Sequence, residues 1–147
     1  MIRIGKQLGT GGEGSVFELP GDSRYVAKIY HHPVANEKAE KLRLMASLAS
    51  EDLTKFAALP VATLSNARNG SIVGLVMPRV SGHSEIHNLY SPAHRKLKFP
   101  DKDWTFLVHV AMNCAASFDA LHLKSLVIGD VNQGNVMVGR ILKLSVF

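Results

Sequence analysis

The sequence contains a single cysteine, Cys114, among its 147 residues. One cysteine excludes an intramolecular disulfide framework and an all-cysteine metal site, and it makes a reducing, cytoplasmic location the expectation. No apolar run approaches the roughly 20 residues that a membrane span requires, and the N-terminus lacks the apolar core of a secretory signal. We therefore expect a soluble protein with no membrane partner.

Charged residues make up only 20% of the chain, whereas hydrophobic residues make up 46%, which is ordinary globular usage. Seventeen lysines and arginines against twelve acidic residues give a formal net charge of +5. This charge favours an anionic partner such as a nucleotide, a nucleic acid or an acidic protein. Because the sequence has no basic-aromatic platform and no recognition-helix pattern, we do not expect nucleic acid to be the partner of this segment.

The first 80 residues show strand patterns interrupted by one helical pattern. Short apolar or β-branched runs predict five strands, at residues 2–8, 15–19, 25–30, 60–64 and 72–77. The first three are joined by a glycine cluster and by a turn at residues 20–22, which predicts an antiparallel meander. Ala39 and Leu42 belong to a small-residue stripe at helical spacing, which predicts a helix over residues 35–49.

The remaining residues predict a mostly helical organisation. Residues 81–100 are rich in serine, glycine, histidine and proline, which predicts an irregular segment. A wide apolar stripe predicts a helix over residues 101–124. Beyond it, short apolar runs at 126–128 and 136–138 flank a polar loop, and a strand-like tail covers 141–147.

The glycine cluster of residues 9–16, GTGGEGSV, fits the pattern GxGxxGxV. Glycine is needed where the backbone approaches a phosphate closely or adopts a positive φ. A dinucleotide-binding fingerprint opens a helix after its strand, whereas here the glycines are followed by another extended run. The strand–glycine–strand order is typical of protein kinases.

Lys28 lies in the third predicted strand and shares a face with Val26 and Tyr30. A lysine on an apolar strand face often has no function there, because its long side chain simply carries the ammonium group into solvent. One strand after a glycine loop, however, its ammonium can reach phosphates beneath that loop.

Glu40 is the carboxylate that we expect to hold Lys28 in position. Its alternative, Glu37, has Lys41 four residues on and is explained as a surface pair. Glu40 shares a helix face with Leu44, which predicts that it points inward.

The polar loop of residues 128–135, IGDVNQGN, carries the most specific signal. Asp130 is followed five positions later by Asn135, which matches the kinase pattern HRDLxxxN at the positions that perform chemistry. There the aspartate orients or deprotonates the attacking hydroxyl, and the asparagine ligates Mg²⁺. A simple Asp/Asn/Gly turn is the alternative, but three kinase elements in the right order favour the catalytic loop.

Taken together, these motifs resemble the front part of a eukaryotic-type protein kinase. More closely, residues 74–80 (GLVMPRV), 90–92 (YSP), 103–108 (DWTFLV) and 128–135 are similar to bacterial kinase-like proteins that often carry a C-terminal helix-hairpin-helix module. The resemblance covers essentially the whole chain and implies an α+β, protein-kinase-like fold. It implies a five-stranded antiparallel N-lobe with one helix over residues 1–80, and the partial helical start of a C-lobe over residues 81–147.

The resemblance also implies which residues would bind ATP and Mg²⁺. Its catalytic set is Asp130, Lys28, Glu40 and Asn132, and its metal ligand is Asn135. The nucleotide contacts that it implies are those of the glycine loop, the adenine slot and the hinge: Gly9, Thr10, Gly11, Gly12, Gly14, Val16, Val26, Lys28, Met77, Pro78, Val80 and Met137.

Several positions depart from the family pattern. Ile128 and Gly129 replace the usual histidine and arginine, and Asn132 stands where serine/threonine kinases usually place a lysine. Residues 136–147 contain no Asp or Glu, so the second Mg²⁺-binding aspartate of the family is missing and the chain reads as truncated.

These departures lead to two functional hypotheses. The first is a serine/threonine kinase-like domain whose intact family transfers the γ-phosphoryl group of ATP to a protein hydroxyl, and which in this chain binds nucleotide weakly and transfers little. The alternative is a catalytically dead pseudokinase or scaffold that acts through protein partners.

Two further features lie outside the kinase motifs. The helix over residues 101–124 lacks the helices that cover its apolar stripe in the resembling family, which predicts self-association through that helix. His83 and His87 stand four residues apart, but no third ligand is spaced nearby, so we expect them not to bind metal.

Overall fold

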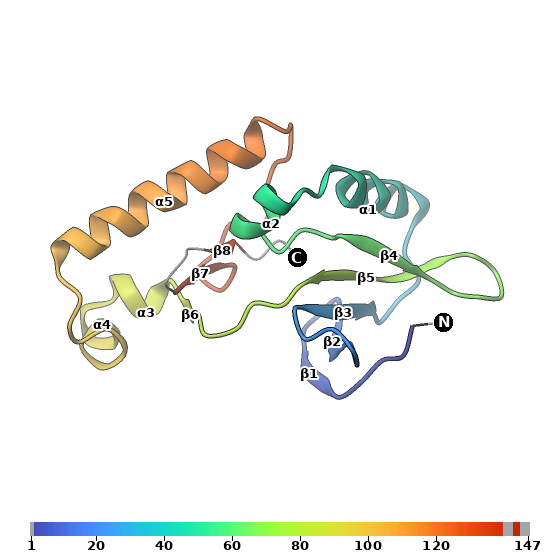
Figure 1. The fold of residues 1–147 in the computed structure, drawn as a ribbon, viewed down its shortest axis with the longest axis horizontal. Coiled ribbons are helices and arrows are strands. Elements are labelled where there is room, and N and C mark those ends of the chain that lie inside the picture. Colours follow the sequence, from blue (N-terminus) through green and yellow to red (C-terminus); the bar gives the residue numbers. More distant parts are fainter. Residues whose placement is uncertain (1, 140–142, 145–147) are drawn as a thin grey trace. The chain divides into compact units, whose positions relative to one another are not determined.

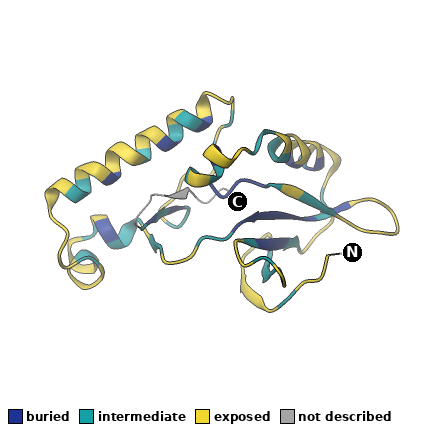
Figure 2. Cartoon of the chain, in the orientation of Figure 1, coloured by how far each residue is buried: buried dark blue, intermediate teal, exposed yellow. Residues whose placement is uncertain are grey.

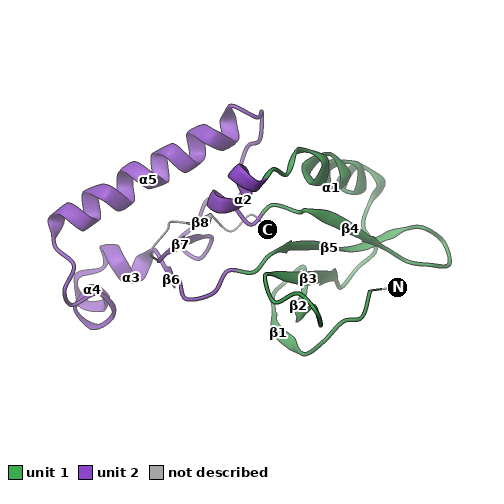
Figure 3. Cartoon of the chain, viewed as in Figure 1, with its two compact units in different colours: residues 1–50, 59–79 green, residues 51–58, 80–147 purple. Residues whose placement is uncertain are grey.

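The computed structural model describes residues 2–139 together with residues 143 and 144. The chain forms two compact units, one of residues 1–50 and 59–79 and the other of residues 51–58 and 80–147 (Figure 3). Figure 1 shows the elements of each unit along the chain. Within the described residues, no helix is both long enough and apolar enough to cross a membrane.

The first unit is built on a five-stranded antiparallel sheet with the strand order β1-β2-β3-β5-β4. The strands are β1 (Gln7–Thr10), β2 (Gly14–Glu18), β3 (Tyr25–Tyr30), β4 (Ala62–Ser65) and β5 (Ile72–Pro78). The antiparallel pairing of β1 with β2 and of β2 with β3 confirms the predicted meander. The first strand begins at Gln7 rather than at residue 2, and Ile2 and Ile4 are exposed.

Helix α1 (Asn36–Leu48) packs against β4 through its small-residue stripe. Ala39 and Leu42 are buried and join a core cluster with side chains of β3 and β5: Val26, Ile72, Leu75 and Met77. The small alanine side chain lets the helix axis approach the sheet closely. The core of this unit therefore lies between α1 and one face of the sheet.

Two glycines allow the strands on either side of β3 to approach it closely. A Cβ on Gly14 of β2 would overlap the carbonyl oxygen of Ile29, and a Cβ on Gly74 of β5 would overlap the carbonyl oxygen of Lys28. In the register of the sheet, Gly74 is the partner of Ile29. The absence of a side chain at both positions thus allows β2 and β5 to lie close to β3, the strand that carries Lys28.

The second unit is mostly helical and contains a small three-stranded sheet in the order β6-β7-β8. Its elements are α2 (Glu51–Phe56), β6 (Ser84–Glu85), α3 (His87–Tyr90), α4 (Pro92–Lys98), α5 (Trp104–His122), β7 (Val136–Val138) and β8 (Lys143–Leu144). The prediction that residues 81–100 are irregular is wrong, because they form β6, α3 and α4. Strand β6 exists only through pairing with β7, about 50 residues later in the chain, and a local pattern does not reveal such a pairing.

Helix α5 begins after the capping residue Asp103, three residues later than predicted, and leaves much of its surface exposed. The Asp103 Oδ1 accepts a hydrogen bond from the Phe106 N–H at 3.0 Å, which satisfies one of the free donors at the helix start. Val110, Ser117 and Leu121 are buried, whereas Trp104, Val108 and Met112 are exposed. Figure 2 shows this exposure along the helix.

The apolar run at residues 126–128 does not form a strand. The chain leaves α5 through Ser125, whose φ of 57° is left-handed, and the Leu126 N–H donates to the Leu121 carbonyl at 3.0 Å. This is a helix-ending hydrogen bond, so that N–H is not available to a strand ladder. Most of the tail expected at residues 141–147 lies outside the described residues, which include only β8 from it.

Candidate nucleotide-binding and catalytic loops

The glycine loop between β1 and β2 is closed by backbone and hydroxyl hydrogen bonds. The Gly11 N–H donates to the Gly14 carbonyl at 2.9 Å. Below this turn, Ser15 Oγ lies 2.9 Å from Thr10 Oγ1 and 3.0 Å from His31 Nε2, so the side chains link both loop strands to the end of β3. The loop is therefore an ordered hairpin tip.

The glycines of this loop leave open space beside the backbone. A Cβ built on Gly9 or Gly12 would meet no atom within 4 Å, and one on Gly11 would reach only the Gly14 carbonyl at 4.0 Å. Backbone N–H groups of such a loop are ordinary phosphate donors. No side chain therefore obstructs the approach of a ligand to the backbone at these three glycines.

Lys28 of β3 is the one charged residue that is buried within the described part of the chain. Its side chain is only 7% exposed, and its ammonium lies 3.3 Å from Glu13 Oε2. The Lys28 Nζ also lies 5.4 Å from the centroid of the Tyr30 ring, which confirms that the two residues share a face. Burial raises the pKa of the Tyr30 hydroxyl, and the nearby Glu13 carboxylate raises it further.

Glu40 does not have the inward orientation expected for it. The structure pairs Lys28 with Glu13, and Glu40 is exposed on α1, as is Leu44, which is 59% exposed. The physical reason is that α1 turns its small-residue face, with Ala39 and Leu42, towards the sheet. An ion pair between Glu40 and Lys28 is absent among the described residues.

Glu13 and Lys38 were missed as site residues by sequence reasoning. Glu13 Oε1 accepts a hydrogen bond from Lys38 Nζ at 2.8 Å, while its other oxygen faces Lys28. Lys38 Nζ also lies 4.7 Å from the centroid of the Tyr30 ring. The one available signal was that Glu13 is the sole acidic residue within the glycine loop.

The contact of Glu13 with its two lysines has a predictable pH dependence. Hydrogen bonding from Lys38, assisted by Lys28, holds the pKa of the Glu13 carboxyl below its ordinary 4.5, although burial opposes this shift. A carboxyl whose pKa is lowered by folding adds stability above its unfolded pKa, and that stability is lost as the pH falls through the folded pKa. We expect the contact to be complete at neutral pH and to break only in acid below pH 4.5.

A carbon-13 NMR titration of the Glu13 carboxyl measures this pKa directly. In Lys38→Met the pKa should rise towards its ordinary value, because the largest cause of the shift is removed. An identical titration curve in wild type and Lys38→Met would contradict the assignment of Lys38 as the main partner.

The residues expected to enclose adenine are distributed over both units. Within the first unit, Val26 of β3 and Met77 of β5 are register partners, and they are 3% and 5% exposed. Val16 of β2 packs against the same cluster. Val80 and Met137 belong to the second unit.

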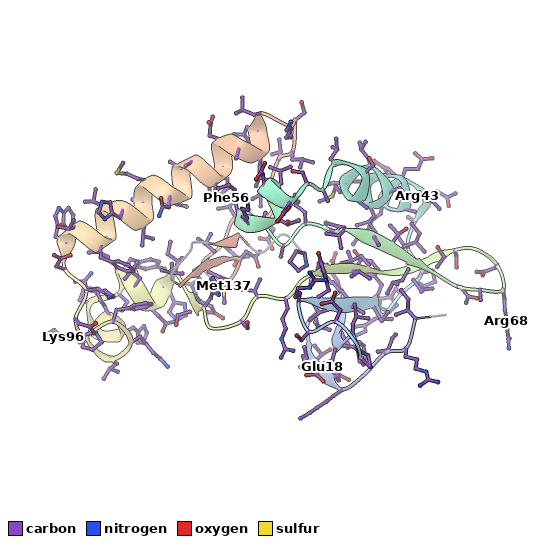
Figure 4. The ribbon with its side chains drawn as sticks, viewed as in Figure 1. Glu18, Arg43, Phe56, Arg68, Lys96 and Met137 are labelled. Carbon is purple, nitrogen blue, oxygen red and sulfur yellow. The ribbon has the colours of Figure 1, made fainter. Side chains whose placement is uncertain are left out.

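The expected hinge, residues 78–80, begins at Pro78, the last residue of β5. The next residue, Arg79, donates its N–H to the Arg24 carbonyl at 2.7 Å. The Arg79 Nη1 lies 3.6 Å from Oε1 of Glu18, which Figure 4 labels on β2. The chain is thus tied to β2 and to the start of β3 immediately before Val80.

In the loop of residues 128–135, two asparagine side chains donate to the carboxylate of Asp130. Asn132 Nδ2 donates to Asp130 Oδ1 at 2.9 Å, and Asn135 Nδ2 donates to Asp130 Oδ2 at 3.0 Å. Asn132 Oδ1 in turn accepts the N–H groups of Gly134 and Asn135, at 2.8 and 3.2 Å. Asn132 therefore orients Asp130 through neutral hydrogen bonds, at a position where the family pattern has a charged lysine.

A further contact supports this loop within the second unit. The Tyr90 hydroxyl donates to Gln133 Oε1 at 2.8 Å. Asp130 and the two asparagines carry carboxylate and amide oxygens, and oxygen atoms are the ligands that Mg²⁺ prefers. The arrangement fits a carboxylate base beside an oxygen-ligated cation.

The glycine hairpin, the buried lysine on the next strand and the Asp130 loop are the features in which the chain resembles protein kinases. Its α+β fold, with a five-stranded antiparallel sheet and helices, is consistent with a kinase N-lobe region. The chain is homologous to the protein described as "Protein kinase YegI" of Escherichia coli (strain K12), being 46% identical to it over 140 residues and 95% of its own length. It is likewise 46% identical over 139 residues to the protein of the same description from Escherichia coli O157:H7.

These relatives are much longer than the chain. The 147 residues span 22% of the length of each relative. No family model matches the chain. The homology confirms the resemblance to a bacterial kinase-like protein.

Proposed function

We propose that the chain is an ATP-binding, serine/threonine protein kinase-like domain. The observation that carries the proposal is the Asp130 loop, in which Asn132 and Asn135 each donate an amide hydrogen to one carboxylate oxygen of Asp130. Two amide donors keep the carboxylate oriented without a permanent charge beside it. A general base needs this control of direction before it can accept a proton from a hydroxyl.

The proposed roles follow from the chemistry of each group. Lys28 would bind the phosphates of ATP as a buried cation, beneath the backbone N–H groups of the glycine loop. Asp130 would orient the attacking hydroxyl of a protein substrate and accept its proton, and Asn132 would hold Asp130 in that orientation. Asn135 would ligate Mg²⁺, which when bound neutralises charge on the transferring phosphoryl group.

The sequence limits the activity that we expect from these 147 residues. Residues 136–147 contain no Asp or Glu, so they provide no second carboxylate for Mg²⁺. Phosphoryl transfer depends mostly on positioning and electrostatics, and loss of one such group typically costs several kcal/mol of transition-state stabilisation. We therefore propose weak nucleotide binding with little or no phosphoryl transfer by this chain.

A thermal-shift titration with MgATP tests the proposed nucleotide site. A ligand at about 100 times its dissociation constant stabilises the native state by ~2.7 kcal/mol, so wild type should melt at a higher temperature as MgATP is added. Lys28→Met should lose this shift, because its methionine cannot pair with phosphate. Lys41→Met removes an equal charge from an exposed position of α1 and should retain the shift.

The same titration separates a second candidate function. Asn132 brings no charge to the loop, and the exposed apolar side chains of α5, including Trp104 and Met112, offer a surface for a protein or for a second copy. These observations favour a pseudokinase or scaffold. The absence of any MgATP shift in wild type, or an equal shift in Lys28→Met, would support the scaffold over the nucleotide site.

A further inference from the structure

The carboxylate of Glu13 bridges two lysines that come from different elements of the first unit. Its Oε2 lies 3.3 Å from the Lys28 ammonium of β3, and its Oε1 lies 2.8 Å from the Lys38 ammonium of α1. Glu13 itself belongs to the tip of the glycine loop. The carboxylate of one loop residue is therefore paired with Lys28, the cation that is expected to bind phosphate.

The two ammonium groups face the same aromatic ring. The Tyr30 ring centroid lies 5.4 Å from Lys28 Nζ and 4.7 Å from Lys38 Nζ. Contact with a ring face favours a cation at each of these positions. The ring and the carboxylate together hold Lys38 beside Lys28, although the Lys38 side chain is 41% exposed and has other rotamers open to it.

A carboxylate and a phosphate are interchangeable ligands for such a pair of cations. Both are oxygen anions that accept charge-assisted hydrogen bonds from ammonium groups. A polyphosphate carries more charge and more acceptor oxygens than one carboxylate, so it gains more from two neighbouring lysines. The geometry around Glu13 is therefore that of an anion site already filled by the protein's own side chain.

We propose that Lys28 and Lys38 form a two-lysine phosphate site, and that Glu13 fills this site in the free protein and is displaced when the polyphosphate of a nucleotide binds. This inference rests on the proposed nucleotide site, and it adds Lys38 as a second phosphate-binding residue and Glu13 as an internal competitor.

The local backbone is suited to such an exchange. The main chain of Glu13 is fixed, because its carbonyl accepts the His31 N–H at 3.0 Å. The preceding residue, Gly12, has open space around its Cβ direction, and the Glu13 side chain is 54% exposed. The carboxylate can therefore leave the lysines by side-chain rotation while the hairpin keeps its hydrogen bonds.

Isothermal titration of the folded chain with MgATP, and separately with inorganic tripolyphosphate, tests the proposal. Glu13→Gln removes the competing charge and should tighten both ligands by about tenfold, the equivalent of one charge-assisted hydrogen bond. Lys38→Met should weaken both by about tenfold on the same basis. Circular dichroism of each variant establishes that it is folded.

Two control variants distinguish an effect of the two-lysine site from an effect of the net charge of the protein. Glu37→Gln and Lys41→Met change the net charge by the same amounts at exposed positions of the same helix, and they should leave both affinities within about twofold. In a Glu13→Gln/Lys38→Met double variant, the gain in affinity from Glu13→Gln should be smaller, because only one of the two lysines remains to bind the phosphate.

Each outcome decides between the two proposals. MgATP binding that is equally affected by Glu13→Gln and Glu37→Gln, or by Lys38→Met and Lys41→Met, overturns the two-lysine site and leaves the nucleotide function standing. Tripolyphosphate binding with the expected variant effects, but without MgATP binding, supports the anion site and overturns the nucleotide function. Failure of both ligands to bind folded wild type overturns both.

Discussion

Gly74→Ala is expected to lower the free energy of unfolding of the first unit by about 1–3 kcal/mol, the usual cost of forcing a methyl group into a packed position. The added Cβ would overlap the Lys28 carbonyl oxygen and would lie 2.9 Å from Ile29 Cδ1. Relief requires β5 to move away from β3, because the obstructing oxygen is backbone. The same movement would displace Lys28, so we also expect Gly74→Ala to weaken MgATP binding.

Gly12→Ala is the matched control for Gly74→Ala. Its Cβ would meet nothing within 4 Å, so the stability should change by no more than about 0.5 kcal/mol. Urea unfolding followed by circular dichroism measures both variants. Equal stability of Gly74→Ala and wild type would contradict the close approach of β5 to β3.

Leu121→Ala is expected to destabilise the second unit by about 2–5 kcal/mol, the range for removing a fully buried leucine side chain. Leu121 lies in the last turn of α5 and is 0% exposed. Its carbonyl also accepts the N–H of Leu126, at the turn that leads into the Asp130 loop. The cavity would therefore form directly before the proposed catalytic loop.

The control for Leu121→Ala lies two residues further along the chain. Leu123 is 77% exposed, so Leu123→Ala should change the unfolding free energy by about 0.5 kcal/mol or less. Urea unfolding monitored by the fluorescence of Trp104, which is also in α5, compares the two variants. Similar losses at both positions would show that Leu121 is not a core residue.

Local sequence patterns predicted the elements whose own residues determine them. Strand β3 occupies the predicted residues 25–30, because a run of β-branched and aromatic residues favours extended structure wherever it pairs. Helix α5 was predicted within three residues at each end, because Asp103 caps it and its apolar stripe is long. The α+β class followed from such elements taken in order.

Elements that depend on distant partners could not be predicted. Helix α2 has only six residues, in a stretch taken as a connection, and its Leu53 is 4% exposed in the folded unit. An isolated helix of this length is unstable in water, so tertiary contacts decide whether it forms. The two-residue strand β6 depends in the same way on β7.

The residues of the candidate site also divide into those that local motifs identify and those that depend on distant contacts. The sequence order identified Lys28 and the Asp130 loop, because each lies within a short motif. It did not identify the ion pairs of Glu13, since these depend on which loop residue the hairpin register brings to Lys28 and on which face α1 buries. The expectation for Glu40 failed because α1 buries the face that carries Ala39 and Leu42, and leaves exposed the face that carries Glu40 and Leu44.

The assignment of residues 51–58 to the second unit has a consequence for the order of folding. These residues are synthesised between β3 and β4 of the first unit, yet α2 contacts α5, whose first residue follows about 50 positions later. On the ribosome, at roughly 5–20 residues per second, α2 is synthesised several seconds before the first residue of α5, the helix that it contacts. During this interval Leu53 of α2, which is 4% exposed in the folded unit, stays without the contacts that bury it.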